Sequence, residues 1–371
     1  MTSHATQARA AGRWLTGVGV IREDGWAAPD TRRKLQLLLA GIWLLDAILQ
    51  FQAFMFSKGF AQMLGATGTG NPGVIAGPIS WAGRTVAQHG VVTNAIFAAI
   101  QLLIALGIAV RPTVRLALGV SIAWALAVWW LGEGLGGVLS GTASPVNGAP
   151  GAVIIYALLA VLLWPPRRER PASFVAGRRT GAPVARALWL VLWGSLAYLA
   201  LQPATSGPKA MSGMISGLAS GEPAWLASTD RHLAAFLATR GGGVAVVLAV
   251  VLAVVAVGIY LRRPAARVVL VLAIAIAAVI WVAEGLGGML TGGGTDPNSG
   301  PLLALLALSY WPLAAPARGL VTRGLVTRGL VTRGAVAGAA PAAESLAAPS
   351  SLAAPSSLAA PSSLAAPSEP V

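Results

Sequence analysis

Long uncharged apolar stretches alternate with short polar segments along most of the chain. A helix needs about 20 predominantly apolar residues to cross the hydrocarbon core of a bilayer. Eight stretches reach or approach this length, at residues 35–56, 91–110, 114–131, 151–164, 185–201, 243–261, 268–290 and 301–315. The fourth and eighth are short, but residues 134–166 contain no side chain that is charged at neutral pH, so loop residues there can lie at membrane depth against protein. The pattern predicts an all-α polytopic membrane protein with eight transmembrane helices.

The sequence also repeats itself at a nearly constant offset of about 151 residues. Glu-Gly-Leu-Gly-Gly at 133–137 recurs unchanged at 284–288. Other matches are Trp43 with Trp193, Gln52 with Gln202, Arg111-Pro112 with Arg263-Pro264, Asn147 with Asn298, Pro150 with Pro301, and Trp164-Pro165 with Trp311-Pro312. Such a constant offset indicates duplication. Because each unit has an even number of helices, we expect two tandem four-helix bundles inserted the same way round.

These patterns predict five regions. Residues 1–34 form a cytoplasmic N-terminal segment, 35–166 the first repeat, 167–184 an arginine-rich cytoplasmic linker, 185–316 the second repeat and 317–371 a low-complexity cytoplasmic tail. In the tail, Gly-Leu-Val-Thr-Arg occurs three times and Ser-Leu-Ala-Ala-Pro-Ser four times. Regular proline prevents a long helix, and the apolar content is too low for a core, so we expect the end of the tail to be disordered.

Charge sets the expected orientation and excludes several classes of protein. With a cytoplasmic N-terminus, 21 of the 26 Lys and Arg residues lie on the cytoplasmic side. This distribution predicts a bacterial inner-membrane protein with both termini in the cytoplasm. The net charge of +14 comes from clusters that flank apolar stretches, a pattern that does not indicate nucleic-acid binding. Cysteine is absent and none of the three histidines lies in a predicted span, so no cofactor is expected.

A family resemblance follows from the order of motifs in one unit. A first helix is followed by a long outer loop with Gly70-Asn71-Pro72 and Trp81, a second helix starting near Asn94 and Phe97, a tight turn with Arg111 and Arg115, and two more helices. This order resembles the DoxX/DoxD-like group of four-helix bacterial membrane proteins, with two units in one chain, over about residues 35–315. The duplication and the Glu-Gly-Leu-Gly-Gly segments depart from that group.

Some members of the DoxX/DoxD-like group are subunits of thiosulfate:quinone oxidoreductases. The resemblance therefore implies an accessory or binding membrane subunit that contacts the lipid bilayer, a membrane-protein partner or a quinone. It carries over no catalytic residue, and we expect no catalytic activity of the chain's own.

Asp46 is the most unusual polar residue, because it falls halfway along the first predicted helix. A carboxylate at mid-membrane costs several kcal/mol unless it is protonated or paired. Its candidate hydrogen-bond partners are Gln50, Gln52, Asn94 and Gln101. Asp46 is therefore either a proton or cation site or a neutral group that fastens two helices. The second repeat has Leu196 at the matching position.

Glu133 and Glu284 are a duplicated pair, each expected near the outer end of its helix. One hypothesis is that both line a cavity for a cation, a proton or a polar head group, with Asn147 and Asn298 as further polar candidates. The alternative is a structural corner, in which each glutamate accepts amide hydrogen bonds from the glycine-rich loop. The first hypothesis makes the chain a small-solute or proton/cation transporter with a site between the repeats. The second favours a structural or assembly role.

The outer segments 57–90 and 203–242 are long for loops. Residues 60–64 and 81–89 predict short amphipathic helices that lie on the outer surface or fold back as a lid. His89 and His232 fall in these segments, where we expect them to be solvated.

Overall fold

A computed structural model describes residues 21–22, 25–26, 30–166, 168, 170–219 and 221–313. All of them belong to one compact unit, Met1–Ala317. The predictions for the tail, and for most of the N-terminal segment, lie outside the described residues.

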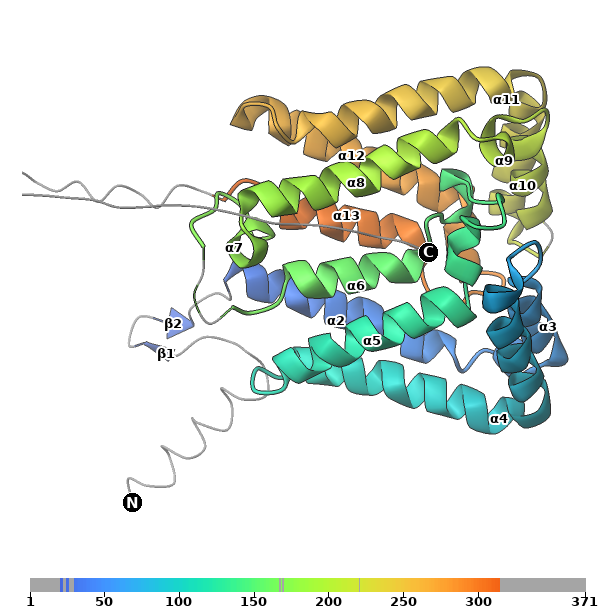
Figure 1. Ribbon diagram of the computed structural model, residues 1–371, viewed down its shortest axis with the longest axis horizontal. Helices are drawn as coiled ribbons and strands as arrows, with labels where there is room; N and C mark the ends of the chain where they lie inside the picture. The colour runs from blue at the N-terminus through green and yellow to red at the C-terminus, as the bar shows by residue number, and fades with distance from the viewer. Residues whose placement is uncertain are drawn as a thin grey trace, which may run out of the picture. The chain divides into compact units, whose positions relative to one another are not determined.

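Helices make up most of the described structure (Figure 1). A two-residue antiparallel pair, β1 (Ile21–Arg22) and β2 (Gly25–Trp26), precedes them. The first half, residues 30–166, contains α2 (Thr31–Leu49), η1 (Ala53–Phe56), α3 (Lys58–Ala66), α4 (Gly73–Ala109), α5 (Val114–Leu131), η2 (Gly134–Gly137), η3 (Pro145–Asn147) and α6 (Ala152–Leu162). The second half, residues 170–313, contains α7 (Gly177–Thr180), α8 (Ala182–Ala200), α9 (Pro203–Ser206), α10 (Ala210–Leu218), α11 (Ala224–Gly258), α12 (Arg263–Ala283), η4 (Gly285–Gly288) and α13 (Ser299–Ser309).

Five of these helices, α4, α5, α8, α11 and α12, are long and apolar enough to cross a membrane. Only 28–39% of the most apolar stretch of each is buried inside the protein. Contiguous exposed apolar surface of this kind is typical of helices that face lipid. α6 and α13 are equally apolar but have 11 residues each. α2 has 19 residues and includes an arginine pair and Asp46. The chain is therefore a helical protein of the multi-pass membrane class.

Helix packing joins the two halves along one seam. α2 packs on α4 and α8 on α11, while α5 packs on α6 and α12 on α13. α13 also packs against α6 and α2 of the first half. Large aromatic side chains fill the centre of the bundle, where Trp43, Tyr156, Trp189, Trp193 and Tyr310 are buried in one cluster. The seam between the halves is therefore part of the core.

The long outer segments are helical and belong mostly to α4 and α11. α4 has a break in helical geometry at His89 (φ −130°, ψ 38°), and α3 lies across the right-hand end of the bundle in Figure 1. The segment 60–64 lies within the short helix α3, as predicted. Residues 81–88 lie in the part of α4 before the break at His89, so the predicted separate helix is present there but begins earlier, at Gly73. His89 and His232 are exposed but lie inside the candidate spanning helices α4 and α11, not in loops.

Candidate functional site

Glu133 and Glu284 each follow a long helix and open the same tight corner. The next residues form a 3-10 turn in which Leu135 (φ 59°) and Leu286 (φ 53°) are left-handed. A left-handed leucine is strained and persists only where the surrounding structure fixes it. α12 consequently ends at Ala283, although the apolar sequence predicts a helix to residue 290.

Each corner glutamate binds the start of the short helix that follows. Glu133 Oε1 accepts a hydrogen bond from Val153 N at 3.2 Å, in the first turn of α6. Glu284 Oε1 accepts one from Ser299 Oγ at 2.6 Å, at the first residue of α13. A carboxyl group at a helix N-terminus satisfies amides that have no partner within the helix. The donors belong to the following helix and not to the glycine-rich loop, so these contacts anchor each corner but are not the loop hydrogen bonds that the structural hypothesis predicted.

The second carboxyl oxygen of each glutamate makes no comparable contact with a helix. Glu133 Oε2 and Glu284 Oε2 are buried without a hydrogen-bond partner. Burial raises the pKa of Glu133 well above its ordinary range, and the charge of Asp296 raises it further. Glu284 is 4% exposed, and burial raises its pKa to about 8. At neutral pH most Glu284 side chains therefore carry a proton.

Asp296 was missed by the sequence analysis and stands at the centre of the acidic groups. Its Oδ1 accepts a hydrogen bond from Asn298 N (2.6 Å) and its Oδ2 from Thr295 Oγ1 (3.0 Å). Burial raises its pKa above the ordinary value. Its charge acts on Asp46, Glu133 and Glu284, so these three carboxyl groups lie within electrostatic range of it. The one available signal was its place two residues before the repeated Asn298.

Asp46 is not halfway along its helix. α2 ends at Leu49, so Asp46 lies in the last turn, at the end of the bundle that carries the two corners. It is 1% exposed, and its Oδ2 accepts a hydrogen bond from Tyr156 Oη of α6 at 2.6 Å. Its Oδ1 has no partner. Tyr156 was not among the expected partners, because nothing in the sequence gives the register of α2 against α6.

Two of the expected partners of Asp46, Gln50 and Gln52, instead tie the halves together. Gln50 Nε2 donates to Thr295 O (3.4 Å) and Gln52 Nε2 to Gly294 O (3.2 Å), across to the loop before α13. Asn94 Nδ2 donates to Gln50 O (2.6 Å). A loop of the first half makes the reciprocal contact, because Ser144 Oγ accepts a hydrogen bond from Thr205 Oγ1 at 2.8 Å.

A polar cavity of about 490 Å³ lies where these two loops meet. Glu133, Asn147 and Asn298 line it, whereas Asp46 and Glu284 do not. The other polar side chains that line it are Thr67, Thr69, Ser140, Thr142, Thr295 and Asp296, and no lysine or arginine does so. Asn298 also caps α13, its Oδ1 accepting a hydrogen bond from Ser299 N at 2.8 Å, while Asn147 is exposed. The structure thus brings three of the five candidate residues to one cavity and leaves two buried nearby.

Within the described ranges, no group of three or more His, Asp or Glu side chains is arranged to hold a metal ion. Comparison of the chain with protein-family models, curated proteins and solved structures finds no match. The DoxX-like resemblance is therefore still a prediction, and the polar cavity is the feature of the structure that bears on function.

Proposed function

We propose that this chain is a proton-linked transporter of a small cation or amine, with eight membrane spans in two tandem halves and a binding site between them. Five candidate spans are present, and α2, α6 and α13 complete the proposed eight. The order of elements supports duplication: α2 and α8 have 19 residues each, α3 and α10 nine, α4 and α11 37 and 35, and α6 and α13 11. If the protein lies in the inner membrane with both termini in the cytoplasm, the cavity opens on the side of the membrane away from the cytoplasm.

The polar cavity between the halves carries the proposal. Its lining presents carboxyl, hydroxyl, amide and backbone oxygens without a basic side chain. A cation or an ammonium group with several N–H donors complements such a lining, whereas an anion would meet Glu133 and Asp296. The pKa values of both carboxyl groups are raised, so a proton and a cation compete for the same two groups. Exchange of this kind is the basic step of a proton-coupled carrier.

Proton movement in liposomes tests the function. The purified protein is reconstituted with a pH-sensitive dye inside, and gradients of sodium, potassium or methylammonium are imposed in turn. We expect at least one gradient to drive proton movement with the wild-type protein. The double variant Glu133→Gln, Asp296→Asn should abolish it, because neither side chain then exchanges a proton.

Glu222→Gln is the matched control, since it removes a carboxyl group outside the cavity lining. It should leave the flux unchanged. Proton movement that persists in the double variant would refute the site, and absence of movement for all three probes in wild type would refute a carrier of these ions.

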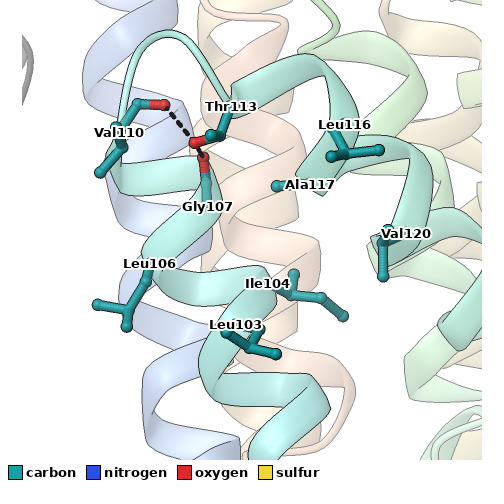
Figure 2. A pocket seen from close by; sticks show the side chains of 9 residues that line it. All are labelled: Leu103, Ile104, Leu106, Gly107, Val110, Thr113, Leu116, Ala117 and Val120. Carbon is teal, nitrogen blue, oxygen red and sulfur yellow. Dashed lines mark hydrogen bonds between the residues drawn. The ribbon is translucent and has the colours of Figure 1, made fainter.

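An accessory role beside a quinone-linked enzyme rests on the DoxX-like resemblance alone. An apolar groove of about 440 Å³ does lie between α4 and α5, lined by aliphatic side chains (Figure 2). Its hydroxyl group, on Thr113, donates within the turn, to Gly107 O (2.8 Å) and Val110 O (3.1 Å). The groove therefore suits an alkyl chain and offers no side-chain donor to a quinone ring. Co-purification of a cofactor-bearing partner from gently solubilised membranes would favour the accessory role.

A further inference from the structure

A second polar cavity, of about 290 Å³, lies at the opposite end of α2. The start of α2 and the ends of α4 and α6 meet there, and its polar lining consists of Asp30, Arg32, Arg33, Gln36 and Arg111. Arg33 and Asp46 are thirteen positions apart in α2, which is about 20 Å along a helix. The carboxyl cavity and this arginine cavity are therefore separate sites with opposite charge.

Backbone carbonyls accept hydrogen bonds from the guanidinium groups of Arg32 and Arg33. Arg33 is 4% exposed and donates to Ile108 O (2.8 Å) and to Ala109 O at the end of α4. Arg32 Nη1 donates to Trp164 O (2.7 Å), just beyond α6. Cations at helix C-termini stabilise carbonyls that lack partners within the helix. These contacts explain why the arginines are ordered, but they do not explain a cavity lined by three of them.

Charge in this cavity is far from balanced. Asp30 is the one carboxylate in the lining, and it already accepts a hydrogen bond from Arg33 N (2.9 Å) as the N-cap of α2. Arg111, exposed at the rim, acts electrostatically on Arg33. Arg33 Nε is buried without a hydrogen-bond partner. Three guanidinium groups beside the positive N-terminal end of a 19-residue helix form a site for an anion with several oxygens, such as a phosphate group.

The apolar groove begins at the same turn. Val110 and Thr113 line the groove between α4 and α5 (Figure 2). Arg111 and Val114 line the arginine cavity. Residues 110–114 thus separate an alkyl-sized groove from a phosphate-sized cavity. We propose that this pair of cavities binds one anionic glycerophospholipid, with its phosphate among the arginines and one acyl chain between α4 and α5. A free phosphate ion would use the arginine cavity alone.

The second half does not repeat the site. At an offset of 150, Ala182 and Pro183 stand where the first half has Arg32 and Arg33. Arg186 lies over the rings of Phe174 and Tyr260, at 5.9 and 5.8 Å from their centroids. Aromatic packing there takes the place of an anion site, so we expect one bound lipid per chain.

Native mass spectrometry of the delipidated full-length protein tests the proposal, with phosphatidylglycerol and phosphatidylcholine as probes. We expect one retained phosphatidylglycerol and weaker retention of phosphatidylcholine. Arg111→Gln should weaken phosphatidylglycerol binding about fivefold, the effect of one basic residue near a lipid surface. Arg115→Gln is the matched control, because Arg115 is exposed nearby and donates to Pro165 O (3.2 Å) without lining the cavity.

A second variant tests the groove without changing charge. Leu116 is 73% exposed and lines the groove, so Leu116→Trp should fill it and reduce lipid retention in a protein that still folds. Equal binding of the two lipids, or equal loss in Arg111→Gln and Arg115→Gln, would overturn the proposal. Full displacement of phosphatidylglycerol by millimolar inorganic phosphate, with no effect of Leu116→Trp, would also overturn it in favour of a soluble phosphate site.

Discussion

The two Glu-Gly-Leu-Gly-Gly corners share their backbone and differ in their surroundings. In both, leucine is left-handed, and the glutamate binds the start of an 11-residue helix. Around the first corner, Asn71 Nδ2 donates to Thr67 O at 3.1 Å. The second has Glu222 at the matching position, and burial and the charge of Asp230 raise the pKa of Glu222 to about 7. The shared features are sufficient to explain the turn itself.

The acidic residues also fall into two groups, those that recur in both halves and those that occur in one half only. Glu133 and Glu284 occur in both halves and have folding contacts, whereas Asp46 and Asp296 match Leu196 and Pro145. Asp296 nevertheless lies within electrostatic range of Asp46 and of both corner glutamates. A fold-defining element must recur in both copies, but a site on the seam needs each residue once. The unrepeated aspartates are therefore better markers of function than the repeated glutamates.

Replacement of the corner glycines should have the largest effect. Gly136 has φ +63°, and a Cβ there would lie 2.1 Å from Pro150 O; Gly287 has φ +69°, with a Cβ 2.7 Å from Pro297 C. Gly136→Ala and Gly287→Ala should each lose several kcal/mol of stability and much of the folded protein, because backbone atoms cannot move aside. Size-exclusion chromatography and thermal unfolding in one detergent measure both.

Gly141→Ala is the control for these two variants. Its φ is +74°, but a Cβ there has open space within 4 Å, so only the left-handed conformation is penalised, by about 1–2 kcal/mol. Equal stability of Gly136→Ala and Gly141→Ala would contradict the close contact between the backbone of the first corner and residue 150.

The pH dependence of stability should show the burial of the corner glutamates. The pKa of Glu284 is about 8 in the folded protein against 4.5 ordinarily, so the folded state binds a proton that the unfolded state releases between these values. The stability that the folded protein gains from keeping this proton on Glu284 is fully present below pH 4.5. It is lost as the pH rises through 8. The free energy of unfolding should therefore fall by up to about a few kcal/mol between pH 5 and pH 8.5. The unfolding temperature, which is the measured quantity, should fall with it. Glu284→Gln should flatten this slope and exceed wild type at pH 8.5.

Glu133→Gln should flatten the slope in the same direction, since burial also raises that pKa. Wild-type and variant proteins with parallel pH profiles would mean that these carboxyl groups are solvated in the folded state.

The apolar pattern predicted the helical membrane class and most helix positions, including residues 114–131, which match α5. It failed where apolar composition continues through a turn. The predicted first helix ran to residue 56, but the chain leaves the α-helix after Leu49 and forms a separate 3-10 turn at Ala53–Phe56. Asp46 was consequently placed halfway along its helix, whereas it lies in the last turn. Helix ends depend on packing and capping contacts that hydrophobicity does not encode.

The candidate site was predicted in part, for a related reason. The repeat identified Glu133, Glu284, Asn147 and Asn298, because duplication makes a pattern visible in one sequence. Asp296 and Tyr156 have no repeated partner to mark them. Their roles depend on loop positions and on the rotation of α6 against α2, which emerge only when the helices pack.

The smallest expected effect distinguishes the two repeated asparagines. Asn298 caps α13 through Ser299 N at 2.8 Å, with φ 61°, whereas Asn147 is exposed. Asn298→Ala should lower the free energy of unfolding by about 1 kcal/mol through loss of the cap, and Asn298→Gly by a few tenths. Asn147→Ala should change it by less than about 0.5 kcal/mol. Chemical unfolding of the three variants in one detergent measures this order, and a larger loss for Asn147→Ala would place the structural asparagine in the first half instead.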